Sequence, residues 1–264
     1  MSRCYIIAEV GLSHMGDMER ARRSVLEFAE AGADAVKFQD HSGQYNVPAD
    51  QAHPSPHVSV GRAEWYRRTS FTWDQWKSVR DACERSNVDY IVSPFSVEAL
   101  QRQVKLEPRY IKIASGEVTN RELIKAALGS GVPVLYSTGM SDGDGNWHKV
   151  TRMRCTSEYP CAPEHSRLDW AESEHASVYG GDGFAWSDHT QGIWFPIAAV
   201  AYGCTLLEKH VHLDAARPHS DSDIALTPDK FCEMVEGIRA VEKALYEPSE
   251  PDLTEIRKVY LHAP

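Results

Sequence analysis

Two histidines follow neighbouring apolar runs in the second half of the chain. His189 closes a Ser-Asp-His triplet, His210 closes a Glu-Lys-His triplet, and one helix-sized segment separates them. If the two runs are adjacent parallel strands, about 4.8 Å apart, the imidazoles can meet over one small ion. Neutral imidazole suits borderline divalent ions, and a site with few protein ligands leaves positions for water and substrate. The alternative is that each is an ordinary buried histidine.

Polar side chains interrupt the apolar runs at the ends of the predicted strands. In a parallel barrel, the carboxyl ends of the strands form the face on which active sites are built, whereas a role in stability would place apolar side chains there. Lone serines also fit an ordinary strand end that meets solvent. The residues at these positions are Glu9, Lys37, Gln39, Ser93, Lys112, Ser115, Ser137, Ser157, Tyr159, Ser187, His189, Glu208 and His210.

Lys37 and Lys112 fit the ordinary reading poorly. Lys37 stands between Val36 and Phe38, and Lys112 is flanked by isoleucines. A lysine inside an apolar run needs an anionic partner. Two such lysines with several hydroxyls around them indicate a bound phosphate or carboxylate.

Short apolar runs alternate with helix-period segments along the 264 residues, which is typical of an α/β fold with a parallel sheet. We predict one (β/α)8 TIM barrel over residues 1–246 and a Pro-rich, acidic C-terminal tail over residues 247–264. The eight strands are expected near Tyr5–Ala8, Ala35–Phe38, Tyr90–Val92, Tyr110–Ala114, Val132–Tyr136, Val150–Arg154, Phe184–Trp186 and Thr205–Leu207.

Two connections depart from this alternation. The segment Asp40–Thr72, after the second strand, is a long loop rich in His, Pro and Ser, and we favour a functional lid over an irregular excursion. Between Met140 and Val150, two glycines and room for about two turns predict that the fifth helix is shortened to a loop.

Other residues near these connections are expected to have structural roles. His53, His57, His165 and His175 lack partners at ligand spacing and are expected on the surface. Three tryptophans could stack on a sugar, but packing is the expected role of Trp65, Trp73 and Trp76.

Composition excludes several classes of protein. The net charge of −10 opposes the backbone of nucleic acid, and no apolar run approaches the roughly 20 residues of a membrane span. The amino terminus shows no export signal. The six cysteines form no Cys-x-x-Cys pair, so we expect a reduced, cytoplasmic protein.

The polar strand ends belong to longer motifs that resemble, in order along the chain, those of the sialic acid (N-acetylneuraminate) synthase family. Together these motifs are specific, although each alone is weak. They are Ile7-Ala8-Glu9-Val10-Gly11, Ser13-His14-Met15-Gly16-Asp17, Ala31-Gly32-Ala33-Asp34-Ala35-Val36-Lys37-Phe38-Gln39, Ser93-Pro94-Phe95, Lys112-Ile113-Ala114-Ser115-Gly116-Glu117, Ser137-Thr138-Gly139-Met140, Cys155-Thr156-Ser157-Glu158-Tyr159-Pro160, Ser187-Asp188-His189-Thr190 and Glu208-Lys209-His210.

The resemblance implies a (β/α)8 barrel that condenses phosphoenolpyruvate with an open-chain sugar aldehyde, giving a 3-deoxy-2-keto acid and phosphate. It implies that His189 and His210 hold a divalent metal, usually manganese or magnesium, that Glu9 or Glu208 accepts a proton from water or orients the metal shell, and that Glu9, Gln39, Tyr159 and Asp221 face the sugar or the metal-bound water. The residues implied to bind phosphoenolpyruvate are Lys37, Ser93, Lys112, Ser115, Ser137, Ser157 and Ser187.

The chain departs from the family on the acceptor side. Many members carry a C-terminal antifreeze-like domain that reaches across a dimer and supplies an arginine to the sugar, whereas this chain is expected to lack that domain. Arg62 is the candidate to replace the arginine, and we expect a homodimer or larger assembly. The motifs Ser13-His14-Met15-Gly16 and Pro218-His219-Ser220-Asp221 also differ from the family's Asn-His-Asn-Gly and Pro-Gly-Pro-Asp. The acceptor is therefore not assumed to be the usual N-acetyl hexosamine.

Two other functions use the same residues. A metal-dependent sugar aldolase or epimerase would need both histidines but no phosphate pocket. A non-catalytic barrel that binds a sugar acid or serves as a subunit is the other possibility, and the expected lack of the C-terminal domain and the shortened fifth helix motivate it. The lysines and serines favour the condensing enzyme.

Overall fold

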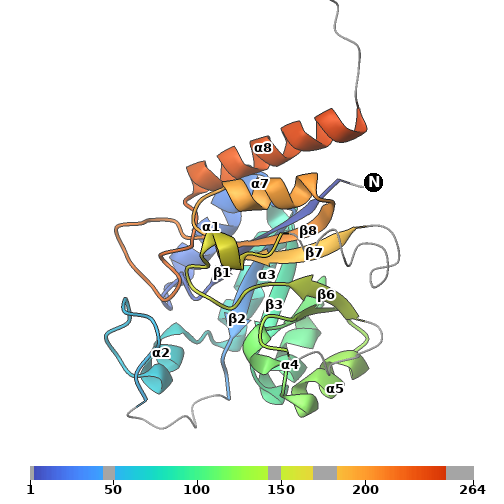
Figure 1. Ribbon diagram of the computed structural model, residues 1–264. Helices are drawn as coiled ribbons and strands as arrows, with labels where there is room; N and C mark the ends of the chain where they lie inside the picture. The colour runs from blue at the N-terminus through green and yellow to red at the C-terminus, as the bar shows by residue number, and fades with distance from the viewer. Residues whose placement is uncertain (1–2, 44–50, 142–149, 169–182, 248–264) are drawn as a thin grey trace, which may run out of the picture.

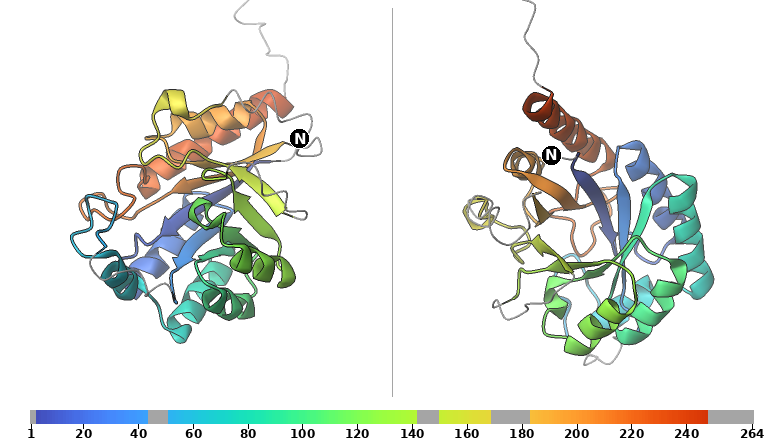
Figure 2. Two further views of the ribbon diagram at one scale, coloured as in Figure 1. Left: turned by 60° about the horizontal axis from the view of Figure 1, so that its bottom comes forward. Right: turned by 90° about the vertical axis from the view of Figure 1, so that its right-hand side faces the viewer.

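The computed structural model describes residues 3–43, 51–141, 150–168 and 183–247. Its eight strands form a closed barrel in chain order, in which β1 (Tyr5–Gly11) pairs in parallel with both β2 (Ala35–Asp40) and β8 (Cys204–His210). The helices lie around the outside of the strands (Figure 1, Figure 2). The predicted (β/α)8 barrel is confirmed.

All eight predicted strands are present. Most of them end later in the sequence than predicted, because the polar residues that were expected to follow the strands belong to them. The other strands are β3 (Asp89–Pro94), β4 (Tyr110–Ile113), β5 (Val134–Ser137), β6 (Val150–Arg154) and β7 (Phe184–Asp188). The described α-helices are α1 (Met18–Glu30), α2 (Arg62–Thr69), α3 (Trp73–Arg85), α4 (Val97–Gln103), α5 (Arg121–Gly129), α7 (Trp194–Ala201) and α8 (Pro228–Tyr246), and short 3-10 turns occupy Val104–Leu106, Ser115–Glu117 and Pro163–His165.

Side chains along each strand alternate between the barrel interior and the surrounding helices, as the pleat requires. On the interior face, a polar residue stands two positions after an apolar one: Glu9 follows Ile7, and Lys37 follows Ala35. The pleat therefore turns these polar side chains inward, above an apolar floor. That floor consists of Ile7, Ala35, Ile91, Leu135, Met153 and Ala185.

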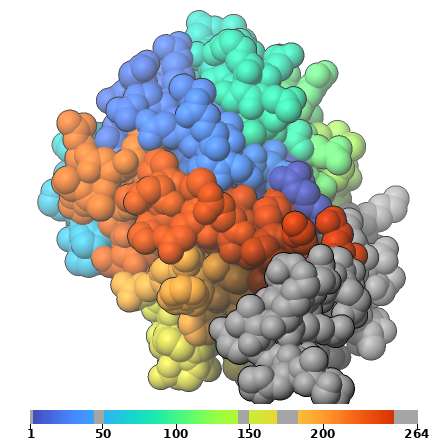
Figure 3. Space-filling view, turned by 90° about the horizontal axis from the view of Figure 1, so that it is seen from above, coloured from blue at the N-terminus to red at the C-terminus, as the bar shows by residue number. Residues whose placement is uncertain are grey.

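Helix α8 closes the outside of the barrel where the first and last strands meet. It lies beside α1 and α7 in the space-filling view (Figure 3). Its buried face includes Phe231, whose ring contacts Phe28 of α1 edge-on at 5.4 Å between centroids. This packing buries the apolar face of the helix. None of the described helices combines the length and the apolar character needed to cross a membrane.

The long connection after β2 is partly helical rather than an open loop, because its last part forms α2. Trp65 and Trp76 are buried and Trp73 packs against the core, so the expected packing role of the three tryptophans is confirmed. Part of the predicted lid, residues 44–50, is not described. The same holds for residues 142–149, where the shortened fifth helix was expected, and for residues 248–264 of the predicted tail. These three segments lie outside the described residues, and the corresponding expectations stay predictions.

A buried ion pair joins the carboxyl ends of β7 and β8. Lys209 Nζ lies 2.6 Å from Asp188 Oδ2, and both side chains are fully buried. Thr190 Oγ1 donates to the same carboxylate at 3.0 Å, and Lys209 also donates to the carbonyl of Thr190. Because His189 and His210 directly follow the two partners in sequence, this pair fixes the backbone that carries both imidazoles.

Substitution of Lys209 by methionine should lower the free energy of unfolding by roughly 3–5 kcal/mol, because Asp188 would stay buried without its counter-charge. The double variant Asp188→Asn/Lys209→Met should lose less, since neither side chain then carries an unpaired charge. Urea unfolding of both variants and the wild type measures the difference. An equal loss in the single and double variants would contradict a role for the buried charge.

Candidate active site

A cavity of about 230 Å³ opens at the carboxyl ends of the strands. Its lining draws on strands from around the barrel and on the connections that follow β6 and β8. Most of the predicted site residues meet there, as the strand-end argument requires. Those in the lining are Glu9, Lys37, Gln39, Ser93, Lys112, Ser115, Ser137, Tyr159, Ser187, His189, Glu208, His210 and Asp221.

Two predicted site residues do not line the cavity. Ser157 lies behind the lining, where its Oγ donates to Ser115 Oγ at 2.8 Å. Arg62 Nε donates to Tyr66 Oη at 3.2 Å, and the guanidinium lies 5.9 Å from the centroid of that ring. Arg62 is thus one side chain away from the cavity, because Tyr66 itself is part of the lining.

The sequence reasoning missed residues that the long connection and its neighbours bring to the cavity. His41, His53, Tyr66 and Phe95 are all in the lining, and the prediction that His53 lies on the surface was wrong. His41 stands two residues after Gln39, so the two-residue alternation extended past the strand would have found it. His53 and Tyr66 carry no such local signal. Of the other histidines expected on the surface, His57 is partly buried and bonds Asp223, His165 is exposed, and His175 lies outside the described residues.

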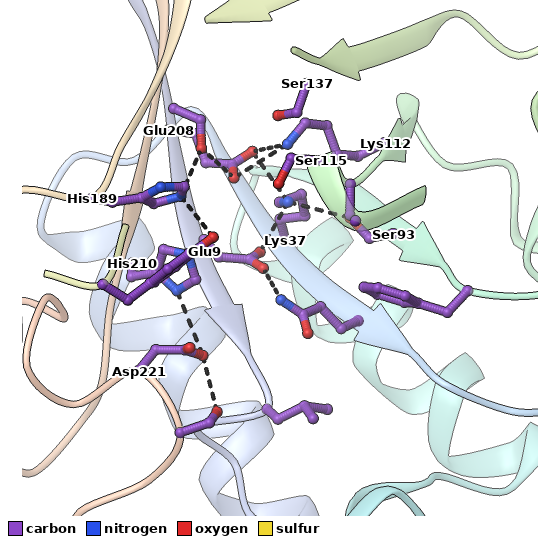
Figure 4. A pocket seen from close by; sticks show the side chains of 18 of the residues that line it. Glu9, Lys37, Ser93, Lys112, Ser115, Ser137, His189, Glu208, His210 and Asp221 are labelled. Carbon is purple, nitrogen blue, oxygen red and sulfur yellow. Dashed lines mark hydrogen bonds and ion pairs between the residues drawn. The ribbon is translucent and has the colours of Figure 1, made fainter. Parts of the chain in front are cut away.

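Two lysines and two glutamates form a buried cluster in the cavity, above the apolar floor (Figure 4). Glu208 Oε2 lies 3.1 Å from Lys37 Nζ and 3.3 Å from Lys112 Nζ. Glu9 Oε2 lies 3.4 Å from Lys37 Nζ. The anionic partners that the two lysines need are therefore carboxylates of the chain itself.

Hydroxyl groups surround this cluster. Ser93 Oγ accepts from Lys37 at 3.2 Å, and Ser187 Oγ donates to Glu208 Oε1 at 3.1 Å. Ser115 and Ser137 complete the lining near Lys112. Together the ammonium groups and hydroxyls offer several donors to an anion that displaces the carboxylates.

The environment separates the two carboxylates in pKa. Burial raises the pKa of Glu9 to about 7, and Lys37 opposes that rise. Burial would also raise the pKa of Glu208, but the charges of Lys112 and Lys37 outweigh it and hold that pKa below its ordinary value. Burial lowers the pKa of Lys112. For Lys37, Glu208 and Glu9 outweigh burial and raise the pKa. Glu208 is therefore a fixed anion, whereas Glu9 exchanges a proton near neutral pH.

The two imidazoles face each other at one side of the cavity, with ring centroids 5.5 Å apart. His189 Nδ1 donates to the carbonyl of Thr156 at 2.6 Å, so its Nε2 is unprotonated and accepts a hydrogen bond from Tyr159 Oη, 3.2 Å away. Burial lowers the pKa of His189 to about 4 and lowers that of His210 well below its ordinary value. Both imidazoles are neutral, which is the form that binds metal.

The donor set fits an open metal site and not a closed one. In the described part of the chain, no group of three or more His, Cys, Asp or Glu side chains is placed to hold a metal ion. Asp221 Oδ2 lies 3.7 Å from His210 Nδ1, and burial raises the pKa of Asp221 to about 6. The residues therefore fit an ion held by two neutral imidazoles and completed by water or substrate.

Two synthases with known names match nearly the whole chain. N-acetylneuraminate-9-phosphate synthase of Mus musculus is 29% identical over 262 residues, which cover 94% of this chain and 72% of that protein. N,N'-diacetyllegionaminic acid synthase of Campylobacter jejuni is 27% identical over 264 residues, which cover 93% of this chain and 78% of that protein.

Solved structures show the same fold. The crystal structure of N-acetylneuraminic acid synthetase from Leptospira borgpetersenii superposes with a TM-score of 0.82 at 24% identity, covering 98% of this chain and 90% of that one. The model of the NeuB family matches residues 24–250. Since that match covers most of the sequence, the chain belongs to the NeuB family.

Proposed function

We propose that the protein condenses phosphoenolpyruvate with a sugar-type aldehyde and forms a 3-deoxy-2-keto acid and inorganic phosphate. One observation carries the proposal: two buried lysines and a set of serine hydroxyls lie in the same cavity as two neutral imidazoles. The names of the relatives, which are synthases of sialic and legionaminic acids, support it.

The lysines and hydroxyls would bind phosphoenolpyruvate. Glu208 now neutralises Lys37 and Lys112, so a phosphate or carboxylate of the substrate would take over part of that role. The hydroxyls of Ser93, Ser115, Ser137 and Ser187 would donate to the remaining oxygens. Fixed donors of this kind also stabilise phosphate as positive charge develops at the carbon that carries it.

We propose that His189 and His210 hold a divalent ion, manganese or magnesium, which when bound would polarise the aldehyde oxygen as a Lewis acid. Gln39, Tyr159 and Asp221 would orient the acceptor. Tyr159 lies beside His189 and Asp221 beside His210, and Gln39 lines the same cavity. The methylene carbon of phosphoenolpyruvate then attacks the aldehyde carbon, and a cationic centre develops at the carbon that bears the phosphate.

Glu9 is the better candidate to accept the proton of the water that adds to this centre. Glu208 is held by Lys37, Lys112 and Ser187, and its lowered pKa makes it a weak base. Among the described residues, only the ammonium of Lys37, 3.4 Å away, lies within ion-pair distance of Glu9 Oε2, and burial raises the pKa of Glu9 to about 7. After water adds, the bond between carbon and the phosphate oxygen breaks and phosphate leaves.

The acceptor side of the site includes a candidate cation near the cavity. Arg62 is one side chain removed from the cavity, against Tyr66, and we propose that it contacts an anionic group of the acceptor. We also propose a cytoplasmic homo-oligomer. The free thiols of all six cysteines support a reducing compartment.

A phosphate-release assay tests the function. Phosphoenolpyruvate, manganese and a panel of aldoses and aldose phosphates should release phosphate only when an acceptor is present. With heavy oxygen at the bridge of phosphoenolpyruvate, the label should appear in the released phosphate, because the carbon–oxygen bond breaks. Label that stays on the organic product would exclude the mechanism. Cleavage or epimerisation of a sugar without phosphoenolpyruvate would favour an aldolase or epimerase.

Phosphoenolpyruvate should raise the thermal midpoint of the wild type, because a ligand that binds only the folded state stabilises it. The shift should disappear in Lys112→Met, which removes one of the two buried ammonium groups. Lys77→Met is the matched control, since Lys77 is exposed and pairs with Asp74. A shift of full size in Lys112→Met would place the phosphate elsewhere.

Protein prepared without chelator should contain close to one equivalent of divalent metal per chain, and His189→Ala and His210→Ala should each lose it. Elemental analysis measures this independently of activity. His165→Ala serves as the control, because His165 is exposed and bonds Glu158. Equal metal content in all four proteins would rule out the site.

A further inference from the structure

A chain of hydrogen bonds runs from His41 to Glu9 through Gln39. Gln39 Nε2 donates to Glu9 Oε1 at 2.7 Å, and His41 Nε2 lies 3.1 Å from Gln39 Oε1. All three residues line the cavity. These hydrogen bonds therefore reach one oxygen of the carboxylate that we propose as the base, whereas its other oxygen, Oε2, lies 3.4 Å from Lys37 Nζ.

The direction of these bonds follows from the charge of Glu9. In its ionised form, which is the form that can act as a base, the carboxylate of Glu9 only accepts hydrogen bonds, so the amide of Gln39 then presents its N–H group to Glu9 and its carbonyl to His41. His41 must then carry its proton on Nε2 and donate it. With the amide turned over, its carbonyl oxygen would face the carboxylate, and the two oxygens would repel each other.

The ring of His41 is fixed from both sides. It stacks on Tyr66 with centroids 4.0 Å apart and an interplanar angle of 9°, and on Phe95 at 3.8 Å and 19°. Tyr66 belongs to α2 and Phe95 follows β3, so two separate elements hold the ring. The side chain is buried. A clamped ring holds its donor in one direction.

The backbone at Gly11 leaves little space around the hydrogen bond between Gln39 and Glu9. Its φ of +52° is in the left-handed region, and a Cβ there would lie 3.2 Å from Gln39 Nε2 and 3.3 Å from Glu9 Oε1. The backbone at Gly11 thus packs directly against the bond between Gln39 and Glu9, which restricts both side chains to this arrangement.

We propose that His41 is a positioning residue: by donating from Nε2 to the Gln39 carbonyl it fixes the orientation of that amide, and through it the carboxylate of Glu9. The proposal rests on the proposed function, because it assigns His41 to the same condensation site. His41 touches neither reacting carbon in this account. It acts through Gln39.

A double-mutant cycle tests whether His41 acts through Gln39. His41→Phe keeps a flat ring for the stack and removes the donor, and should lower kcat/KM for the acceptor about tenfold, with little change in KM for phosphoenolpyruvate. In a Gln39→Met background, His41→Phe should change kcat/KM less than about twofold, because the partner is already gone. A tenfold loss in both backgrounds, or no loss in either, would overturn the proposal.

Two further variants separate the hydrogen bond from the stack. His41→Gln removes the ring but offers an N–H donor at similar reach, and should recover most of the activity lost in His41→Phe. A worse result for His41→Gln than for His41→Phe, with both proteins folded, would show that the stack alone matters and would overturn the proposal. His165→Phe is the control for a histidine-to-phenylalanine change at an exposed position.

One measurement does not depend on turnover. In protein labelled with nitrogen-15 at histidine, two-bond proton–nitrogen spectra report which ring nitrogen carries the proton, and the signal of His41 is the one that His41→Phe removes. We expect the proton on Nε2 in the wild type. A proton only on Nδ1 would overturn the inference, even in a protein that proves active. Conversely, the expected tautomer in a protein that releases no phosphate would leave the positioning intact and disprove only the proposed reaction.

Discussion

Glu208 is the residue on which the mouth of the barrel depends. Its carboxylate lies within 3.3 Å of the ammonium groups of both Lys37 and Lys112, and all three side chains are buried. Without it, two like charges would share a cavity that excludes most water, and one lysine would lose its proton. With it, the charged lysines are kept in place but not saturated, so an incoming anion finds donors that are already oriented. A carboxylate held by two ammonium groups is a weak base, which is why we propose Glu9 and not Glu208 for that role.

The pleat of the strands and the closure of the barrel place these groups. Because β1 pairs with both β2 and β8, Glu9 stands in register with Lys37 on one side and with His210 on the other. Residues nearly as far apart in sequence as the barrel allows become neighbours through this single strand. The pair of Asp188 and Lys209 fixes the adjoining strand ends from the outer face. The ion pair between Asp188 and Lys209 thus helps to hold the strand ends from which Glu208 points into the barrel.

The sequence predicts the site residues whose positions depend on the local strand pattern, and it does not predict those that reach the cavity through tertiary contacts. Lys37 between Val36 and Phe38 signals a buried cation, because the apolar flanks and the strand period are both local, and the same argument found most of the cavity lining. His53 and Tyr66 could not be found in this way. Tyr66 of α2 contacts Leu12 and His41 at the end of the barrel, and His53 lies against Trp65 of the same helix. These contacts join residues that are distant in sequence. Arg62 was chosen for its charge, and its contact with Tyr66 is an i,i+4 pair on α2. That pair could not be read from the sequence while the segment was expected to be a loop.

The lining divides into two groups with different freedom to vary. Lys37, Lys112 and Glu208 are carried by strands, so their directions are set by a pleat that the whole barrel shares. His53, Tyr159 and Asp221 are carried by connections, which can change length and composition without altering that pleat. A lineage could therefore acquire a new sugar partner by remodelling connections while its reaction chemistry stays intact. An engineer could transplant those connections between related barrels with the same expectation.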